Sequence, residues 1–434
     1  MRDATLWRGV LGIEKTVVET VEFDEVEQVL VASVRPTRRQ QQRCGLCRRR
    51  CRIYDRGRGR RRWRALDSCG VQVWLEADAP RVRCPEHGVV VAHVPWARHD
   101  AGHTHTFDQT VAWLATRMSK TAVTELMRVA WRTVGSILER VWADVEAHED
   151  RFEGLRRIGI DEISYRRGYK YLMVVVDHDT GRLVWAAPGR SAATLQEFFD
   201  LLGPERCAKI THVSADGADF IAHAVATNCS DEVVQAADPF HVVRWAVDAL
   251  DEVRRTAWRD ARARARATEL PRRPGRPRKT AAARDASDRA SGLRSARFAL
   301  WKNPENLTGR QRAKIEWIAR TDPDLYLAYQ LKEHLRLVFA LPHPEAAAAL
   351  EDWMIAAADS GLAPFEKLAK TVRIYQGPIL AAIEHDLSNG RVESVNTKIR
   401  LITRIAFGFH TPQALIALAM LSLGGHRPVL PRRH

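Results

Sequence analysis

The sequence predicts an α/β protein with a mixed sheet flanked by helices, a large all-helical insertion, and two small domains ahead of the sheet. Three observations lead to this prediction. Between residues 155 and 245, short apolar runs alternate with helical spacing, which is typical of a sheet covered by helices. Residues 246–385 have helical spacing throughout. Residues 1–98 contain short alternating runs and paired cysteines instead.

The chain is long enough for two to four domains, and its charge is unevenly distributed. It has 434 residues and a formal net charge of +15. Residues 35–64 hold fourteen arginines and one acid, and residues 254–294 hold fourteen Lys or Arg and four acids, so the rest of the chain is net acidic. Such segregated charge predicts a polyanionic partner, because neutralised phosphates release counterions. A solvated basic face without a partner is the alternative.

No feature of the sequence indicates secretion or a membrane. No apolar signal-peptide core follows Arg2. The longest late apolar stretch, residues 414–423, is shorter than the ~20 residues that a membrane helix needs. Seven cysteines in a chain of this length do not suggest a secreted disulfide framework. We therefore expect a cytoplasmic protein with no membrane contact.

Paired cysteines predict a zinc site in the first domain, residues 1–98. Residues 16–34 alternate weakly, as in a hairpin, and residues 71–75 alternate as a strand would. Two pairs of ligands with two residues inside each pair can complete a tetrahedral structural Zn²⁺ site. The candidate ligands are Cys44 with Cys47, and Cys84 with His87.

This ligand set has alternatives. The cysteines could be free thiols beside an unrelated histidine, and Cys51 or Cys69 could replace one of the four ligands. Because fourteen arginines surround the paired cysteines, we expect this domain to bind DNA phosphates.

Residues 99–152 predict a helix-turn-helix domain. Ser119 can cap a helix, and a short turn at residues 129–131 leads into a further helix. In such a motif the second helix enters the major groove by its N-terminal residues. An ordinary three-helix bundle is the alternative. The candidate DNA contacts are Arg132, Thr133 and Ser136.

Residues 153–245 predict the first part of the sheet domain. Three strands linked by turns, followed by a helix and two more strands, would form a mixed sheet with helices on its faces. The second strand is apolar throughout, as in a buried central strand. The expected strands are residues 157–163, 170–177, 181–186, 210–215 and 233–238, and the expected helix is residues 194–202.

Three acids occupy positions from which they could hold metal ions. Asp161 lies within the first strand, Asp216 follows the fourth, and Glu393 lies near the start of a helix. Together they could hold two Mg²⁺ ions about 4 Å apart, which would stabilise the attacking and leaving oxygens at a phosphodiester. An acid at the end of an apolar strand is poorly solvated without a cation.

Each acid also has a simpler interpretation. Asp161 could be a surface carboxylate, with Glu162 as the ligand in its place. Asp216 could belong to a turn, since Asp-Gly favours turns, and Glu393 could be a solvated helix residue.

Residues 246–385 predict an all-helical insertion between the second and third acids, with a basic linker at residues 261–292. Within the linker, residues 271–279 resemble an AT-hook, in which Arg276 would enter the minor groove of A·T-rich DNA. A disordered basic loop that contacts phosphates is the alternative.

Residues 386–434 predict the last part of the sheet domain. Helical spacing places Glu393, Asn396 and Arg400 on one face, so the third acid would lie beside groups that can bind DNA phosphates. The apolar face towards the sheet would be formed by Ile399, Ile402 and Ile405.

These motifs resemble those of the DDE transposases of bacterial insertion sequences, in the ISL-three group. The resemblance spans nearly the whole chain and implies a zinc knuckle, a helix-turn-helix, and an RNase H-like nuclease domain with an all-helical insertion. It rests on the two ligand pairs, Gly-Ile-Asp-Glu at 159–162, Ser-Ala-Asp-Gly at 214–217, Asp-Pro-Phe-His at 238–241, and Ser-Asn-Gly at 388–390 with Glu393 and Asn396. By resemblance, Asp161, Asp216 and Glu393 are the catalytic triad, and Asp238 and His241 are accessory active-site residues.

We therefore predict a DNA transposase that binds the terminal inverted repeats of its element and target DNA. Two Mg²⁺ (or Mn²⁺) ions would serve cleavage and strand transfer, and one Zn²⁺ would be structural. Joining two ends implies a homodimer or larger assembly on DNA, at the nucleoid of a bacterial cytoplasm. The alternatives are a catalytically inactive sequence-specific DNA-binding regulator, and a structure-specific nuclease without strand transfer.

Overall fold

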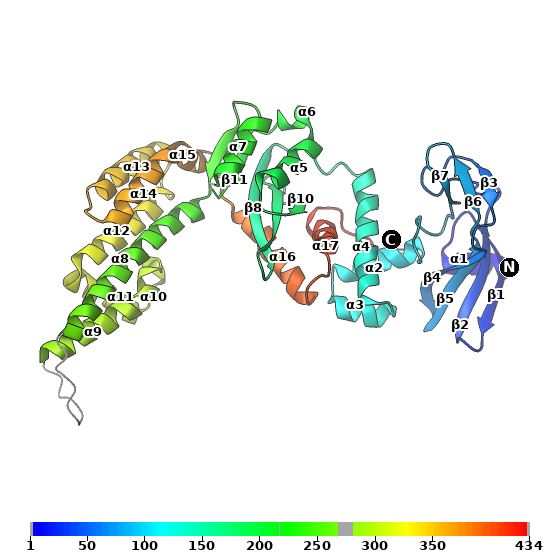
Figure 1. Cartoon of the computed structure of the whole chain (residues 1–434), viewed down its shortest axis with the longest axis horizontal. Coiled ribbons are helices and arrows are strands. Elements are labelled where there is room, and N and C mark those ends of the chain that lie inside the picture. The colour runs from blue at the N-terminus through cyan, green and yellow to red at the C-terminus, as the bar shows by residue number, and fades with distance from the viewer. Residues whose placement is uncertain (1–2, 217, 268–280, 432–434) are drawn as a thin grey trace, which may run out of the picture. The chain divides into compact units, whose positions relative to one another are not determined.

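The computed structural model describes residues 3–216, 218–267 and 281–431 (Figure 1). The chain divides into two compact units. One unit combines residues 1–151 with 399–434, and the other contains residues 152–398. Each unit is described by itself. From the sequence we expected all of residues 386–434 to complete the sheet domain, whereas residues from Ile399 onwards group with the first unit.

The N-terminal part of the first unit consists of two small sheets. One has the order β1-β2-β5-β4 and the other the order β3-β6-β7. The expected hairpin is present, since β1 and β2 pair antiparallel. Side-chain alternation buries Trp63, Val73 and Leu75 completely or nearly so, and these form the core. The elements are α1 (Asp3–Leu11), β1 (Thr16–Asp24), β2 (Val29–Pro36), β3 (Arg52–Asp55), β4 (Arg60–Ser68), β5 (Val71–Asp78), β6 (Arg81–Cys84) and β7 (Gly88–Val91).

Three helices follow and form the expected helix-turn-helix arrangement. Ser119 caps α3 by accepting a hydrogen bond from the amide of Ala122. A three-residue turn then leads into α4, with Arg128 in the left-handed region at φ +52°. The helices are α2 (His105–Ala115), α3 (Lys120–Met127) and α4 (Trp131–His148).

The C-terminal residues of the first unit pack on these helices. The apolar helix α17 (Pro412–Leu423) lies against α4. Ile402 and Ile405, which we expected to face the sheet, instead line a cavity of about 90 Å³ together with Leu138 and Leu418. In the described parts of the chain, no helix is both long and apolar enough to cross a membrane.

The second unit contains the expected mixed sheet. Its strand order is β10-β9-β8-β11-β12. β9 is antiparallel to both of its neighbours, β10 and β8, whereas β8, β11 and β12 are mutually parallel. The strands are β8 (Arg157–Arg166), β9 (Lys170–Asp177), β10 (Leu183–Pro188), β11 (His212–Ala215) and β12 (Val234–Ala237).

Apolar burial explains why these segments form a sheet. Residues 172–176 of β9 are completely buried, as expected for a strand covered on both faces. Phe198 and Phe199 of the helix predicted at residues 194–202 pack into the same core. The helices beside the sheet are α5 (Ala192–Leu202), α6 (Pro204–Cys207) and α7 (Asp219–Asn228) (Figure 1).

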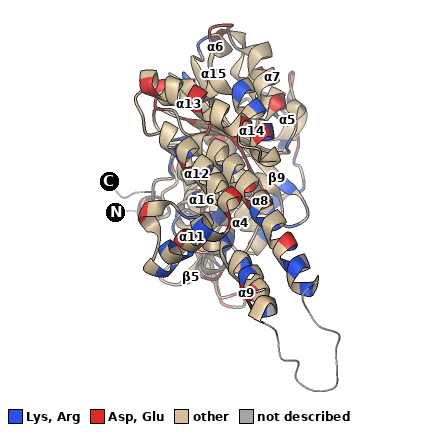
Figure 2. Ribbon diagram, turned by 90° about the vertical axis from the view of Figure 1, so that its left-hand side faces the viewer, with Lys and Arg blue, Asp and Glu red and all other residues tan. Residues whose placement is uncertain are grey.

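The helical insertion has a core of its own, which includes Leu350, Trp353 and Phe365. Lys and Arg recur along α8 and α9, with Asp and Glu between them (Figure 2). Residues 271–279 of the basic linker, including Arg276, lie outside the described residues. The elements are α8 (Pro239–Ala267), α9 (Ala281–Ser295), α10 (Arg297–Leu300), η1 (Pro304–Asn306), α11 (Gly309–Thr321), α12 (Pro323–Val338), α13 (His343–Ala358), α14 (Ala363–Ile374) and α15 (Gln376–Glu384).

The first residues of α16 (Gly390–Ile405), which belong to the second unit, approach β8 closely. A Cβ atom at Gly159 would lie 2.3 Å from Cγ2 of Val392 and 2.8 Å from Nε2 of His178. Glycine at this position therefore allows the first turn of α16, which bears Glu393, to contact the strand that bears Asp161.

We expect Gly159→Ala to lower the free energy of unfolding by about 1–3 kcal/mol, because the added methyl group overpacks this contact. Urea denaturation measures the change, and adding Val392→Ala should restore part of the loss. Gly309→Ala is the matched control, since nothing lies within 4 Å of a Cβ there. Equal stability of Gly159→Ala and the wild type would contradict the close packing.

Candidate active site and metal centre

Three aspartates lie at one level on three neighbouring parallel strands. Pairing between β8 and β11 joins the two residues that lie two positions before Asp161 and Asp216. Pairing between β11 and β12 joins the two residues that lie one position before Asp216 and Asp238. Neighbouring strands are about 4.8 Å apart, so the same register places the three side chains in a row. The row lies at the carboxyl ends of β11 and β12, where open α/β sheets bind their ligands.

Asp161 is in an unfavourable environment for an uncompensated charge. Burial raises its pKa, the amide of Glu162 opposes the shift by donating to Oδ1 at 2.7 Å, and Asp216 and Asp238 raise the pKa further. A divalent cation would reverse the effect of burial and of the like charges. The carboxylate oxygens at this edge therefore fit a hard cation such as Mg²⁺.

Glu162, the alternative ligand, has a different partner. Its carboxylate forms an ion pair with Arg190 at 2.5 Å, and its side chain is 9% exposed. Successive side chains of a strand point to opposite faces, so Glu162 and Asp161 do not share a face. This geometry favours Asp161 as the ligand.

Asn396 connects α16 to Asp161. Its Nδ2 donates a hydrogen bond to Oδ2 of Asp161 at 2.7 Å, and its side chain is buried. Within the described residues, Oδ1 of Asn396 is buried without a hydrogen-bond partner. An unpaired oxygen beside a carboxylate is a second observation that fits a cation at this site.

Glu393 precedes Asn396 by three residues, so it lies on the same side of α16, one turn earlier. Its side chain is exposed. The three acids do not form a tight group: in the described part of the chain, the cysteine cluster discussed below is the one group whose ligand atoms all lie within 4.8 Å. The structure therefore places Asp161 and Asp216 on adjacent strands and Glu393 on the adjoining helix.

Asp238 and His241 form a hydrogen-bonded pair at the start of α8. Nδ1 of His241 lies 2.7 Å from Oδ2 of Asp238, and this bond raises the pKa of His241. The other oxygen of Asp238 accepts a hydrogen bond from the amide of Asn389 at 3.2 Å. Asp238 thus ties the start of α8 to the residue that precedes α16.

A buried polar network supports the same region, and the sequence analysis missed it. Nε2 of His178 lies 2.6 Å from Oγ of Ser214, and Ser214 donates to Oδ1 of Asn389. All three side chains are buried. The sequence did offer one signal, because His178 directly follows an apolar strand. A histidine buried at such a position requires a hydrogen-bond partner.

We expect His178 to make the protein less stable in acid. Burial lowers the pKa of His178 to about 4, whereas an unfolded histidine has a pKa of about 6.5. Between these values the unfolded chain binds a proton that the folded chain does not, so the free energy of unfolding decreases as the pH falls. Urea denaturation between about pH 4.5 and 7.5 should show that the free energy of unfolding depends less steeply on pH in His178→Gln than in the wild type. Equal flattening in His410→Gln, an exposed histidine, would contradict this origin.

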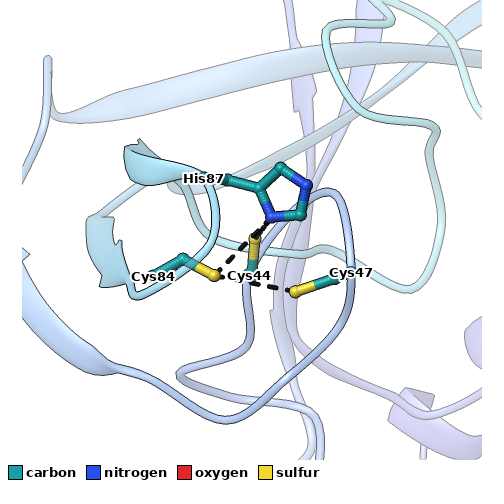
Figure 3. A group of neighbouring side chains, drawn as sticks. All are labelled: Cys44, Cys47, Cys84 and His87. Atoms are coloured by element: carbon teal, nitrogen blue, oxygen red, sulfur yellow. Dashed lines mark hydrogen bonds between the residues drawn. The ribbon is translucent and has the colours of Figure 1, made fainter.

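The four predicted zinc ligands meet in the first unit (Figure 3). Cys84 Sγ lies 3.6 Å from Cys47 Sγ and 3.6 Å from His87 Nδ1, and Cys44 Sγ lies 3.8 Å from His87 Nδ1. Ligands of a tetrahedral Zn²⁺ with bonds of about 2.3 Å are separated by about 3.8 Å. The residue types and their separations therefore suggest a zinc site.

The environment of the cluster agrees with this assignment. A hydrogen bond with His87 lowers the pKa of Cys84 to about 6, towards the thiolate form that binds metal. The two spare thiols are not members of the cluster. Cys51 is buried and donates to the carbonyl of Arg49, and Cys69 is exposed in a left-handed turn.

The predicted DNA-contacting residues are accessible on α4. Arg132 and Ser136 are exposed and Thr133 is half-buried, all within its first two turns. Arg400 is exposed two turns after Glu393 on α16.

Family comparisons match three consecutive parts of the chain. The zinc-finger of transposase IS204/IS1001/IS1096/IS1165 matches residues 40–87, and the helix-turn-helix domain of transposase family ISL3 matches residues 92–142. The transposase domain of the DDE type in the same family matches residues 158–419, which is more than half of the chain. The chain belongs to the ISL3 transposase family.

Curated relatives agree along the full length. The transposase for insertion sequence element IS1557 of Mycobacterium tuberculosis is 59% identical over 439 aligned residues, covering 100% of this chain and 98% of the relative. The transposase for insertion sequence element IS1001 of Bordetella parapertussis is 26% identical, covering 94% of this chain and 95% of that protein. The expected family and its domain order are confirmed: this ISL3 transposase has a zinc-finger region, a helix-turn-helix and a DDE domain.

Proposed function

We propose that Asp161, Asp216 and Glu393 are the acids with which this transposase cuts DNA at the ends of its element and joins those ends to target DNA. The observation that supports the proposal is the row of aspartates at one sheet edge, contacted through Asn396 by the helix that bears Glu393. The phosphodiester would bind beside this row of aspartates, at the carboxyl ends of the parallel strands.

Two chemical steps would take place there. In the first, a water molecule loses a proton as its oxygen bonds to phosphorus, the P–O3′ bond breaks, and the freed 3′-oxygen gains a proton. In the second, this 3′-hydroxyl loses its proton as its oxygen bonds to a target phosphorus, and the target 3′-oxygen leaves and gains a proton. The acids would orient these groups without forming a covalent bond to DNA.

When bound, Mg²⁺ or Mn²⁺ would supply Lewis-acid stabilisation of the phosphoryl oxygens and of the entering and leaving oxygens. Asp161 and Asp216 would hold two such ions, and Glu393 would complete the coordination of one. Asn396 would orient Asp161 through the hydrogen bond from its Nδ2, and its Oδ1 would accept a hydrogen bond from bound water.

Asp238 and His241 would be accessory residues. Asp238 orients the ring of His241, and the raised pKa of His241 favours a positive charge there. The negative charges of Asp161 and Asp216 also raise the pKa of His241. The positive charge of His241 would therefore attract a phosphate bound beside these two aspartates.

The first unit would recognise the terminal inverted repeats. Cys44, Cys47, Cys84 and His87 would hold one structural Zn²⁺. Exposed arginines at residues 48–50, directly after Cys47, would bind phosphates. Arg132, Thr133 and Ser136 would enter the major groove, and Arg276 and Arg400 would add phosphate or minor-groove contacts.

A transposase must bring two element ends to one target, so we infer that the protein acts as a homodimer or larger assembly on DNA. Its positive segments would keep it on the nucleoid of the bacterial cytoplasm.

An assay with pre-cleaved element ends, supercoiled target DNA and Mg²⁺ tests the function. Joined products are expected. Nicking of the supercoiled target without joining would indicate a structure-specific nuclease, and sequence-specific binding without either reaction would indicate an inactive regulator.

A further inference from the structure

The β8–β9 hairpin extends beyond the row of aspartates. β8 has ten residues whereas β11 has four, and the pairing between them ends at Gly159. From Asp161 onwards β8 therefore continues past the carboxyl ends of its parallel neighbours, paired with β9 alone among the described strands. Its tip, residues 166–170, projects from the sheet edge that carries the acids.

Tyr169 at this tip has no role in folding that the structure reveals. Its side chain is 89% exposed, so it contributes little to a core. Its φ of +58° lies in the left-handed region, which disfavours a bulky side chain and suits Gly or Asn. A strained and exposed aromatic residue is an unfavourable choice for a turn, and such outliers concentrate at functional sites.

Unpaired positive charge surrounds this tyrosine. Arg166, Arg167 and Lys170 are all exposed, and none of them forms an ion pair with any described residue. Lower on the hairpin, the guanidinium of Arg190 lies 5.1 Å from the ring centre of Tyr171. Alternating basic and aromatic residues are the chemistry that binds phosphates and stacks on bases.

We propose that the hairpin tip binds element-end DNA beside the reacting phosphodiester, with Arg166, Arg167 and Lys170 on phosphates and the ring of Tyr169 stacked on an unpaired or unstacked base. Arg166 lies five residues after Asp161, or roughly 17 Å along the strand. At about 3.4 Å per nucleotide, this reach corresponds to roughly five base pairs of DNA. Because both groups project from one edge, a single duplex can contact the tip while its end lies at the acids.

This inference rests on the proposed function for the position of the DNA end. A binding experiment nevertheless tests the contact between the hairpin tip and DNA without any catalysed reaction. Asp161→Asn as a background removes catalysis, and the probe is a duplex of one element end with 2-aminopurine placed in turn at each of the last ten positions or so. A 2-aminopurine whose neighbouring base has left the helical stack fluoresces more strongly. We expect a position about five base pairs from the cut to brighten on binding.

Tyr169→Asn is the decisive variant because it removes the ring and relieves the backbone strain. It should unfold no more easily than the wild type, so lost activity would not reflect misfolding. In the Asp161→Asn background we expect loss of the 2-aminopurine signal, and in the otherwise wild-type protein we expect a decrease in strand transfer of about tenfold or more, whereas Tyr169→Phe should retain both. An unchanged signal and unchanged strand transfer in Tyr169→Asn would overturn the stacking assignment.

Charge variants test the phosphate contacts separately. In Arg166→Gln/Arg167→Gln, the slope of log affinity against log salt should become shallower by about 2, since each phosphate contact contributes about 0.9. Lys367→Gln/Lys370→Gln removes two exposed charges from α14 and is the matched control. Equal changes in both double variants would overturn a local role for the hairpin.

Failure of the function and failure of the inference give different results. If the wild type joins no DNA but the Tyr169-dependent fluorescence persists, the proposed function fails and the hairpin contact stands. If the wild type joins DNA and Tyr169→Asn does so equally well without loss of signal, the hairpin contact fails alone.

Discussion

Asp161→Asn, Asp216→Asn and Glu393→Gln are each expected to lower DNA cleavage and strand transfer by about a hundredfold to a thousandfold or more while leaving DNA binding intact. Each change keeps the size of the side chain and removes the negative charge that a divalent cation needs. Losses of this order follow removal of a single electrostatic group from an active site. Strand-transfer products quantify the chemistry, and gel-shift titration with an element end quantifies binding.

Asp200→Asn on α5 is the matched control for these variants. It neutralises an exposed acid of the same domain that accepts a hydrogen bond from Gln196. Its activity should stay within about twofold of the wild type, because surface substitutions change stability little. Near-normal strand transfer by any one of the three acid variants would exclude that residue from the catalytic set.

Removing zinc is expected to unfold the small sheet around the cysteine cluster and to abolish tight binding of element ends. The apparent binding free energy of structural Zn²⁺ is about 10–16 kcal/mol, and in a region this small much of it is folding free energy. Cys84→Ser should therefore lower the zinc content from about one ion per chain to none. Hydrogen exchange should lose protection in residues 43–51 and 81–92.

Cys69→Ser provides the comparison, because Cys69 is exposed and is not part of the cluster. It should retain zinc and bind DNA like the wild type. A full zinc content in Cys84→Ser, or loss of zinc in Cys69→Ser, would contradict the assigned ligand set.

Local patterns predicted most of the elements correctly. The two ligand pairs, the Ser119 cap and the apolar run of β9 each depend on residues close together in the chain. Such signals remain readable because hydrogen bonding, side-chain spacing and burial act within one helix or strand. The order of the motifs indicated the family, which the comparisons then confirmed.

The candidate site depended on contacts that the sequence does not encode locally. The sequence suggested acids that could lie side by side, but only the strand register aligned Asp238 with Asp161 and Asp216. The network from His178 through Ser214 to Asn389 was invisible in the sequence because its members lie on three separate segments.

By itself, the sequence determined which residues can serve as ligands, which segments become helices or strands, and to which family the chain belongs. Only the tertiary structure decided how these segments meet. It placed Asn396 against Asp161 across 235 residues of chain, grouped Ile402 and Ile405 with the first unit, and left Tyr169 exposed beyond the acids. The physical reason is that packing between distant segments sets register and exposure, and a local pattern of residue types is compatible with more than one such packing.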